Sequence, residues 1–364
     1  MPYLTNGFTI WVKDLVTFAH EKLKNLSEAV EEMEAKPLNA AQCAVIDRHF
    51  ERFGRSEHSR LRIDETQSSV YNPRTARLHV HKHDRRLSGK QELVFDSAAG
   101  RATSLTSHTL KLWDRRRHAS AREYARIQGF PESFVLPRQL VANLFGNAVA
   151  VPCAMHACRS VVGSDGAAPG TLLDLCAGIG GFHLAAQTAF PRIRCVGFCD
   201  VKPAAVQCYK ENFPDVPALG DITAVQEWPR ADLLTAGFPC QPFSRACDIK
   251  VRAVHKDRLF YEHVFDAIDA ARPNYVVLEN VRSLACPTGK PQLDAILNAF
   301  RDRGYHTDHR ILDAADFGLP QQRFRIYIVA RLGGSVEVPP APPCARTTLG
   351  DILEDAEDAV HTDP

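Results

Sequence analysis

From Thr171 onward, short apolar segments alternate with amphipathic stretches of helical spacing. The apolar segments are residues 172–175, 195–199, 233–236, 275–278 and 325–329. This alternation is typical of an α/β fold in which helices cover both faces of a mostly parallel sheet. We therefore predict a doubly wound α/β core over residues 171–335. A second, smaller domain is expected before it, because 364 residues exceed the usual length of one domain.

The chain before this core has several different patterns. Helical periodicity extends over residues 8–35 and 39–54, whereas residues 60–113 contain only short alternating segments, centred on 78–81 and 93–95. The remaining predicted segments are helices at 121–128 and 142–158, a Gly-, Ser- and Ala-rich linker at 161–170, and a Pro-rich tail at 336–364 with a short helix at 349–354.

Charge is distributed unevenly along the chain. The net charge is +1, yet residues 52–117 carry 15 Lys and Arg against 7 Asp and Glu. A basic block of this kind indicates either a surface for a polyanion or a solvated Arg-rich face. We expect no membrane span, no signal peptide and no disulfide framework, since the 11 cysteines are scattered. These features favour a cytoplasmic protein.

A glycine-rich segment, 174–182, lies between the first predicted strand and the helix that follows it. Glycines there allow a tight turn, and the helix N-terminus favours an anionic group. The second strand ends at Asp200, and Gly220-Asp221-Ile222 follows the next strand region. Together they indicate a site for a nucleoside-containing cofactor, the alternative being an ordinary turn with surface carboxylates.

Cys240 lies in the sequence Gly237-Phe238-Pro239-Cys240-Gln241-Pro242, at the carboxyl end of a predicted strand. Ligands bind at that edge of open α/β sheets. Flanking prolines favour an exposed loop, where a thiol can act as a carbon nucleophile. The alternative is a buried structural cysteine, which this context makes less favourable.

Two further segments carry charged groups to the same region. Glu279 follows the apolar strand 275–278, where partial desolvation would raise the pKa of its carboxyl group, unless it is simply solvated. Arg323 and Arg325, in Gln321-Gln322-Arg323-Phe324-Arg325, share one strand face if the strand has begun, which suits contacts to phosphate or to a base carbonyl.

Taken together, these four motifs resemble those of the DNA (cytosine-5) methyltransferase family, in order and in spacing. Residues 122–131 are similar to the family's ninth motif, and Gly146-Asn147-Ala148-Val149 with Pro152 to its tenth. Both come here before the glycine loop instead of at the C-terminus. The chain therefore resembles a circularly permuted member with a Rossmann-like S-adenosylmethionine-dependent methyltransferase fold. The predicted organisation is a small domain 1–118, a permuted segment 119–160, a linker 161–170, a catalytic core 171–335 and a tail 336–364.

The resemblance implies a reaction on double-stranded DNA. The target cytosine is flipped out of the duplex, Cys240 adds to C6, Glu279 acts at N3, and S-adenosylmethionine methylates C5 before the cysteine is released. Arg325 would position the ring from its carbonyl side and Arg323 would support it from the phosphate side. The implied cofactor contacts are Asp174, Cys176, Gly178, Gly180, Phe182, Asp200, Val201, Asp221, Ile222, Pro239, Leu259, Asn147 and Ala148.

This sequence departs from the family pattern at several of these positions. Cys176 stands where the family usually has Phe, Asp200 where Glu is more usual, and Val201 where a larger residue is common. The segment 255–260 lacks the glycine of the family's mobile loop. These differences predict a weaker or shifted hold on the cofactor and an altered closure of the loop.

DNA recognition is expected in the basic block 52–117, whose charge suits phosphate contacts. The candidate DNA-binding residues are Gln241, Ser244, Arg258, Arg115, Arg116 and Arg117, the last three having a solvated turn as the alternative. The N-terminal helical region could serve self-association or a second subunit. We expect no metal site, because Cys153, His156 and Cys158 lie on one helix without a fourth ligand nearby.

The leading hypothesis is a DNA cytosine-5 methyltransferase of a restriction–modification or DNA-protection system, cytoplasmic and nucleoid-associated if bacterial. Two alternatives remain at this point. One is an RNA (tRNA) cytosine-5 methyltransferase on the same sheet, and the other is a regulatory homologue that needs a partner for DNA recognition.

Overall fold

The computed structural model describes residues 105, 119–239, 260–345 and 347–354, and the backbone of short strands between residues 69 and 118. The predicted helices at 8–35 and 39–54 and the nucleophile loop from Cys240 to Leu259 lie outside the described residues. The chain divides into two compact units, one of residues 1–99, 109–123 and 353–364, the other of residues 100–108 and 124–352. This division differs from the predicted boundaries, because residues 100–108 belong to the sheet-containing unit and residues 119–123 and 353–364 belong to the other unit.

The first unit contains short strands, as the pattern of residues 60–113 predicts. β1 (Ser69–Asn72) pairs antiparallel with β2 (Arg77–Val80). β3 (Leu93–Phe95) pairs parallel with β5 (Leu110–Leu112), which pairs antiparallel with β6 (Arg117–His118). The strand segments predicted around 78–81 and 93–95 are confirmed, with the first lying one residue earlier, at Arg77–Val80.

Helix α4 (Ala121–Gln128) begins at the predicted residue because its N-terminus is capped by side chains. The Ser120 amide donates to Glu123 Oε2 at 2.8 Å, and the Glu123 amide donates to Ser120 Oγ at 3.2 Å. This reciprocal arrangement is a capping box, which satisfies backbone groups that the first turn leaves without partners.

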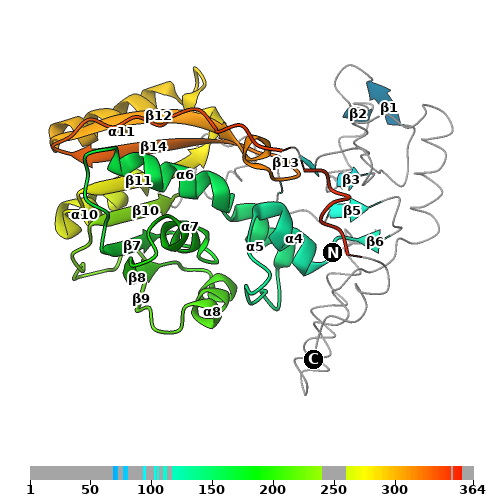
Figure 1. Cartoon of the computed structure of the whole chain (residues 1–364), viewed down its shortest axis with the longest axis horizontal. Helices are drawn as coiled ribbons and strands as arrows, with labels where there is room; N and C mark the ends of the chain where they lie inside the picture. Colours follow the sequence, from blue (N-terminus) through cyan, green and yellow to red (C-terminus); the bar gives the residue numbers. More distant parts are fainter. Residues whose placement is uncertain are drawn as a thin grey trace, which may run out of the picture. The chain divides into compact units, whose positions relative to one another are not determined.

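The second unit is built on a seven-stranded sheet in the order β12-β14-β11-β10-β7-β8-β9 (Figure 1). β14 runs antiparallel to both of its neighbours, whereas the pairs from β11 to β9 are parallel. The strands are β7 (Thr171–Leu175), β8 (Arg194–Cys199), β9 (Ala218–Gly220), β10 (Leu233–Gly237), β11 (Tyr275–Val281), β12 (Tyr305–Asp313) and β14 (Phe324–Leu332). The predicted mostly parallel, doubly wound sheet is confirmed.

Helices and short strands complete this unit. They are β4 (Ala102–Thr103), α5 (Val141–Asn147), α6 (Val151–Val162), α7 (Gly181–Ala189), α8 (Pro203–Asn212), α10 (Phe260–Ala271), η2 (Arg282–Ala285), α11 (Lys290–Asp302), η3 (Ala314–Phe317) and β13 (Gln321–Gln322). The predicted short helix at 349–354 is wrong, because those residues form turns.

The order of the strands creates a topological switch point. β8 lies on one side of β7 and β10 on the other, so the chain leaves β7 in one direction and later returns to its opposite side. At such a point the loops after neighbouring strands diverge and leave a crevice at the carboxyl ends. This is the edge at which the predicted site residues gather.

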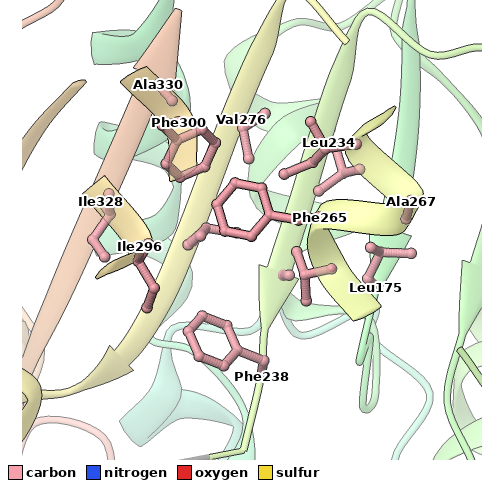
Figure 2. Close-up of a cluster of buried hydrophobic side chains, with 14 of the residues drawn as sticks. Leu175, Leu234, Phe238, Phe265, Ala267, Val276, Ile296, Phe300, Ile328 and Ala330 are labelled. Atoms are coloured by element: carbon pink, nitrogen blue, oxygen red, sulfur yellow. The ribbon is translucent and has the colours of Figure 1, made fainter. Parts of the chain in front are cut away.

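One face of the sheet is covered by α10 and α11 with an apolar cluster (Figure 2). Phe265 of α10 and Phe300 of α11 meet with ring centroids 4.8 Å apart. They pack on alternate residues of the strands, among them Leu234, Val276 and Ile328. Burial of this cluster supplies much of the hydrophobic stabilisation of the unit.

The prediction of a single helix over residues 142–158 is wrong, because this segment forms two helices, α5 and α6. Backbone at Ala148 and Ala150 is extended, with ψ of 154° and 113°, between α5 and α6. Pro152 explains the break, because its ring would clash with the carbonyl group of Ala148, four residues earlier, in a continuous helix. The sequence pattern missed this because the residues on both sides are apolar.

Val141–Val162 is, within the described residues, the stretch that matches a membrane span by length and composition, with a mean hydropathy of 1.3. The helices of this stretch are α5 and α6, and 61% of its apolar window is buried inside the protein. Core helices pass the same test of length and composition.

The linker, which is rich in Gly and Ala, is held to the sheet by hydrogen bonds. α6 ends at Val162, two residues inside the predicted linker, and its C-cap residue Gly163 has a φ of +68°. Asp165 accepts a hydrogen bond from Arg331 Nη1 at 2.6 Å, and the Tyr275 hydroxyl donates to the Ala167 carbonyl at 3.0 Å. These contacts come from β14 and β11.

Candidate functional site

The strand register brings the predicted motifs to one edge of the sheet. Leu175 is level with Ala236 of β10 and with Cys199 of β8, and Gly237 is level with Glu279 of β11. The segments that follow these strands therefore emerge side by side. The glycine loop, Asp200, the entry to the Cys240 loop and Glu279 share this edge, as the sequence predicts.

The glycine loop turns through backbone conformations that favour glycine. Gly178 and Gly180 have φ of +57° and +88°, and Gly180 is the N-cap of α7. A Cβ at Gly180 would lie 2.5 Å from the Phe213 ring, whereas a Cβ at Gly178 would meet no atom within 4 Å. The loop is therefore packed tightly on one side and open on the other.

Cys176 stands in the same loop with φ of +51°, a conformation that residues with a Cβ rarely adopt. Its thiol is partly buried, and burial raises the pKa of this thiol well above its ordinary value. Cys176 is therefore a neutral, apolar contact in this loop and has no aromatic surface to offer.

Asp200 links the glycine loop to the segment after β8. Its Oδ2 accepts from the Gly178 amide at 2.8 Å and its Oδ1 from the Lys202 amide at 2.8 Å. The Lys202 ammonium donates to Asn143 Oδ1 of α5 at 2.6 Å, and Asn147 Nδ2 donates to the same oxygen at 3.3 Å. The sequence did not single out Lys202 and Asn143, although they connect two predicted cofactor residues.

The other predicted cofactor residues differ in exposure. Val201 is exposed and Asp221 and Asn147 lie at the surface, whereas Phe182, Ile222 and Ala148 are buried. Asp221 Oδ1 accepts from the Thr223 amide and hydroxyl, both at 2.9 Å. Pro239 is exposed at the end of the described segment.

Asp174 is fully buried beneath the loop, at the end of β7. Its Oδ1 accepts from the Thr235 hydroxyl at 2.8 Å, whereas its Oδ2 has no partner among the described residues. Desolvation raises the pKa of this carboxyl group to about 7, partly offset by the Thr235 hydrogen bond. Asp174 therefore offers a buried acceptor in β7, the strand that leads into the glycine loop.

His183 lies in α7 and is also buried. Its Nδ1 is 2.9 Å from the Tyr209 hydroxyl, and desolvation lowers the pKa of the imidazole to about 4. The ring also lies against Phe213, with centroids 3.9 Å apart. His183 is therefore a neutral packing residue at neutral pH.

Glu279 lies inside β11 and not after it, a correction to the predicted strand end, because its backbone pairs with both Gly237 and Tyr327. Its carboxylate Oε1 is 3.1 Å from Arg325 Nε. Desolvation raises the pKa of this carboxyl group in spite of the opposing effects of Arg325 and Arg323. Glu279 thus combines a cationic partner with a tendency to retain a proton.

The neighbourhood of Glu279 connects it with the loop that carries Cys240. A Cβ built on Gly237 would lie 3.8 Å from Glu279 Oε2 and from Phe182, and 3.9 Å from Val149. Asn280, which is buried, donates from its side chain to the Phe238 carbonyl at 3.1 Å. Asn280 therefore fixes the backbone that leads into Cys240, a role that the sequence did not reveal.

The sequence predicted a strand face shared by Arg323 and Arg325 on the condition that the strand had already begun at Arg323. That condition is not met, because β14 begins at Phe324. The Arg323 side chain is 2% exposed and donates to backbone carbonyl groups of Gly146, Ala148 and Leu105. The described structure thus directs this guanidinium toward the protein interior instead of the phosphate side.

Several predicted site residues lie outside the described residues. They are Cys240, Gln241, Ser244, Arg258, Leu259, Arg115 and Arg116, and only the backbone of Arg117 is described. Cys153 and Cys158 are buried in α6, and His156 Nε2 is 3.0 Å from the Pro339 carbonyl. No group of three metal-ligating side chains occurs in the described part of the chain.

Comparison with known proteins gives a consistent result. The sequence matches the family model for C-5 cytosine-specific DNA methylases over residues 10–162 and 170–361. It is 39% identical over 194 residues to the Type II methyltransferase M.NlaX of Neisseria lactamica, covering 52% of this chain and 62% of that protein. It is 34% identical over 185 residues to the Type II methyltransferase M.MspI of Moraxella sp., covering 50% and 44%. The chain thus spans about half the length of these curated relatives.

Solved structures with partial similarity include a DNMT2 mutant from Spodoptera frugiperda, with a TM-score of 0.37 and 23% identity, covering 45% of this chain and 50% of that chain. Another is a putative DNA modification methyltransferase encoded within an E. coli prophage, with a TM-score of 0.37 and 21% identity, covering 44% and 46%.

Proposed function

Because the chain belongs to the C-5 cytosine-specific DNA methylase family, we propose that it transfers a methyl group from S-adenosylmethionine to C5 of cytosine in a specific double-stranded DNA sequence. The observation that carries the proposal is the pair of buried Glu279 and partly buried Arg325, 3.1 Å apart, beside the strand end that leads into Cys240. The glycine loop lies on the same edge of the sheet.

The residues at this edge fit an S-adenosylmethionine site. The loop is open at Gly178, where a Cβ would meet no atom, and Asp174 Oδ2 is a buried acceptor without a partner among the described residues. Asp200 provides a carboxylate at the end of β8, where ribose hydroxyls are held in folds of this type. Asn147, Ala148, Val201, Asp221, Ile222 and Leu259 complete the proposed set.

Cys240 begins the reaction as the nucleophile. A cytosine flipped out of the duplex presents C6 to its thiolate, and a covalent C6–S bond forms. Glu279 donates its proton or a hydrogen bond to N3, which draws electrons away from C6. The cofactor supplies an electrophilic methyl group to C5. Loss of the C5 proton and elimination of the thiolate then release the methylated base.

Arg325 serves this step in two ways. Its contact with Glu279 holds the carboxyl group in position, and its guanidinium offers donors to the carbonyl oxygen of the cytosine ring. The raised pKa of Glu279 suits the reaction, because the group must carry a proton to donate it.

The order of the motifs supports a circularly permuted architecture as part of this proposal. The residues similar to the ninth and tenth motifs precede the glycine loop, and the family model matches in two segments on either side of residues 163–169. α6, which follows the tenth-motif residues, makes contacts with α7, β11 and β14. The biological setting we propose is a cytoplasmic restriction–modification or DNA-protection system, a proposal supported by the similarity to proteins named Type II methyltransferases.

The experiment measures transfer of labelled methyl groups from S-adenosylmethionine to unmethylated plasmid DNA and, separately, to tRNA. We expect label in DNA at one sequence context. Cys240→Ala should abolish transfer and retain cofactor binding, whereas Cys344→Ala, at an exposed thiol that hydrogen-bonds Asp316, should retain full activity. Label in tRNA alone would overturn the DNA assignment, and transfer by Cys240→Ala would overturn the covalent mechanism.

A further measurement isolates the covalent step. Fluorine at C5 of the target cytosine removes the proton whose loss permits elimination, so the enzyme–DNA bond should persist under denaturing conditions. We expect this species with the wild-type chain and its absence with Cys240→Ala.

A further inference from the structure

Arg323 is a buried cation that joins three segments of the second unit. Nη2 donates to the Ala148 carbonyl at 2.8 Å and to the Gly146 carbonyl at 3.1 Å, and Nη1 donates to the Leu105 carbonyl at 3.1 Å. A guanidinium can form several such bonds at once because its donors lie in one rigid plane. Lysine has a single ammonium group and cannot reproduce this arrangement.

Two of these carbonyl groups lie at the break between α5 and α6, that of Gly146 in the last turn of α5 and that of Ala148 directly after the helix. Pro152 removes the amide that would otherwise bond to Ala148 in a continuous helix, so the Ala148 carbonyl needs another donor. Arg323 and Gln128 supply donors, the latter from Nε2 at 3.2 Å. Gln128 Nε2 also lies against the Phe145 carbonyl. The break is therefore held by side chains from outside both helices.

Gln321 connects the same groups on the other side. Its Nε2 donates to Gln128 Oε1 at 3.0 Å and to the Ile127 carbonyl at 3.1 Å, and its Oε1 accepts from the Leu105 amide at 2.8 Å. Gln128, Gln321 and Arg323 are all buried. We call these three side chains the buried clamp.

The α5–α6 break faces the proposed cofactor site. Asn147 shares the acceptor Asn143 Oδ1 with Lys202, whose backbone is bound to Asp200. Val149 lies against the start of α7, since a Cβ at Gly181 would be 2.8 Å from it. A displacement of this break would therefore move Asn147 and the wall of the glycine loop together.

The other end of the clamp leads to the base-binding side. Arg323 is two residues from Arg325, which holds Glu279. The backbone amide of Arg323 donates to Asp313 Oδ1 at 2.7 Å, and this hydrogen bond fixes the backbone immediately before β14. The clamp thus connects the segment that carries Asn147 with the strand that carries Arg325.

We propose that Arg323, through the buried clamp, is a positioning residue that sets the α5–α6 break for S-adenosylmethionine and does not contact DNA phosphate. This inference rests on the proposed function. It assigns Arg323 to cofactor affinity, whereas the sequence alone assigned it to the DNA side.

The experiment uses the full chain and two binding measurements that do not depend on turnover. Affinity for S-adenosylmethionine is measured by calorimetry without DNA, and affinity for a duplex containing the target site is measured without cofactor over a series of salt concentrations. For Arg323→Lys we expect cofactor affinity to fall by roughly tenfold or more, the effect of ~1.4 kcal/mol. The salt dependence of DNA binding should be unchanged, because no phosphate contact is lost.

Arg331→Lys is the matched control. Arg331 also lies in β14, is buried, and donates to the Val162 carbonyl at 2.9 Å, but at the opposite end of α6. The Arg331→Lys substitution should lower the thermal stability of the protein and leave its affinity for S-adenosylmethionine unchanged. If Arg323→Lys does not fold, Gln128→Met tests the same clamp, since it removes the second donor to Ala148 and the residue has no charge to offer a phosphate.

Three results would overturn the inference. The first is that Arg323→Lys binds DNA more weakly, with the slope of DNA affinity against salt concentration reduced by about one, while its cofactor affinity is unchanged. That combination would identify Arg323 as a phosphate contact. The second is unchanged affinity for both ligands, and the third is an equal loss of cofactor affinity in Arg331→Lys. If the wild-type chain itself does not bind S-adenosylmethionine, the proposed function fails, and this result is distinct from the other three.

Discussion

The two faces of the seven-stranded sheet differ in chemistry, although the same strands form both. Toward α10 and α11 the strands present Leu234, Val276 and Ile328, which belong to the apolar cluster (Figure 2). The intervening residues include Thr235 and Glu279, which are buried and polar. Alternation along a strand assigns neighbouring residues to opposite faces.

This difference separates stability from chemistry within one sheet. The apolar face can be packed without regard to the reaction, whereas the polar face must retain Asp174, Thr235 and Glu279 in the interior with their hydrogen-bonding partners. A slip of one residue in strand register would exchange the two sets. The three predictions that follow test how far the faces are independent.

The largest effect is expected on the polar face. Glu279→Gln preserves size but removes the proton that the raised pKa retains, so methyl transfer should fall by about 10²–10⁴-fold. The measurement is the single-turnover rate with saturating DNA and cofactor. Glu337→Gln, at an exposed position, should retain the rate. A Glu279→Gln enzyme with more than about a tenth of the wild-type rate would contradict the assigned role.

The apolar face should respond in stability instead of rate. Phe300 is fully buried between Phe265 and Tyr305, with ring centroids at 4.8 and 5.6 Å. Phe300→Ala should lower the free energy of unfolding by about 3–5 kcal/mol, measured by urea denaturation, while the rate per folded molecule stays constant. Ile311→Ala, on the exposed side of β12, serves as the small-effect control. A change in rate as large as that in Glu279→Gln would show that the faces are coupled.

The smallest effect is the net pH dependence of stability in the wild-type chain, because the contributions of Asp174 and His183 oppose each other. The pKa of Asp174 is raised from 3.8 to about 7, so its contribution to stability is present at low pH and is lost as the pH rises through 7. The pKa of His183 is lowered from 6.5 to about 4, so its contribution is lost as the pH falls through that range. The two slopes oppose each other between pH 4 and 6.5.

Single variants should reveal each slope. In His183→Gln, the free energy of unfolding should rise by ~1.4 kcal/mol for each unit of decreasing pH between about 7 and 4. In Asp174→Asn, the free energy of unfolding should fall by ~1.4 kcal/mol for each unit of decreasing pH between about pH 6.5 and pH 4. Urea denaturation at a series of pH values provides the measurement. Profiles that match the wild type in both variants would show that these groups do not titrate in folding.

The strands that carry the site could be predicted because each contains a run of mostly apolar residues, as buried parallel strands do. β12 was not predicted, since its residues His306, Asp308 and Arg310 give it no apolar run. It is one of the two edge strands of the seven-stranded sheet, and its partly exposed residues follow from that position. Its absence from the prediction did not affect the site, which lies near the centre of the sheet.

The predicted chemistry of Glu279 followed from a local pattern, an apolar strand with a carboxylate at its end. The environment of Arg323 could not be predicted in this way, because its partners Gly146 and Leu105 are 177 and 218 residues away in the chain. The break at Pro152 was detectable in principle, since proline excludes the carbonyl group four residues earlier from helical bonding. The structural role of this break depends on the side chains that donate to the Ala148 carbonyl in place of the missing amide. These are Arg323 and Gln128, which lie in other segments of the chain.

The fastening of residues 163–170 has a mechanical consequence. Arg331 of β14 donates hydrogen bonds to Asp165 and to the Val162 carbonyl, and Tyr275 of β11 donates to the Ala167 carbonyl. These bonds fix a segment whose composition, rich in Gly and Ala, would otherwise favour a flexible connection. A pulling force on α6 would therefore pass into the middle of the sheet through side chains before it reached β7 along the backbone.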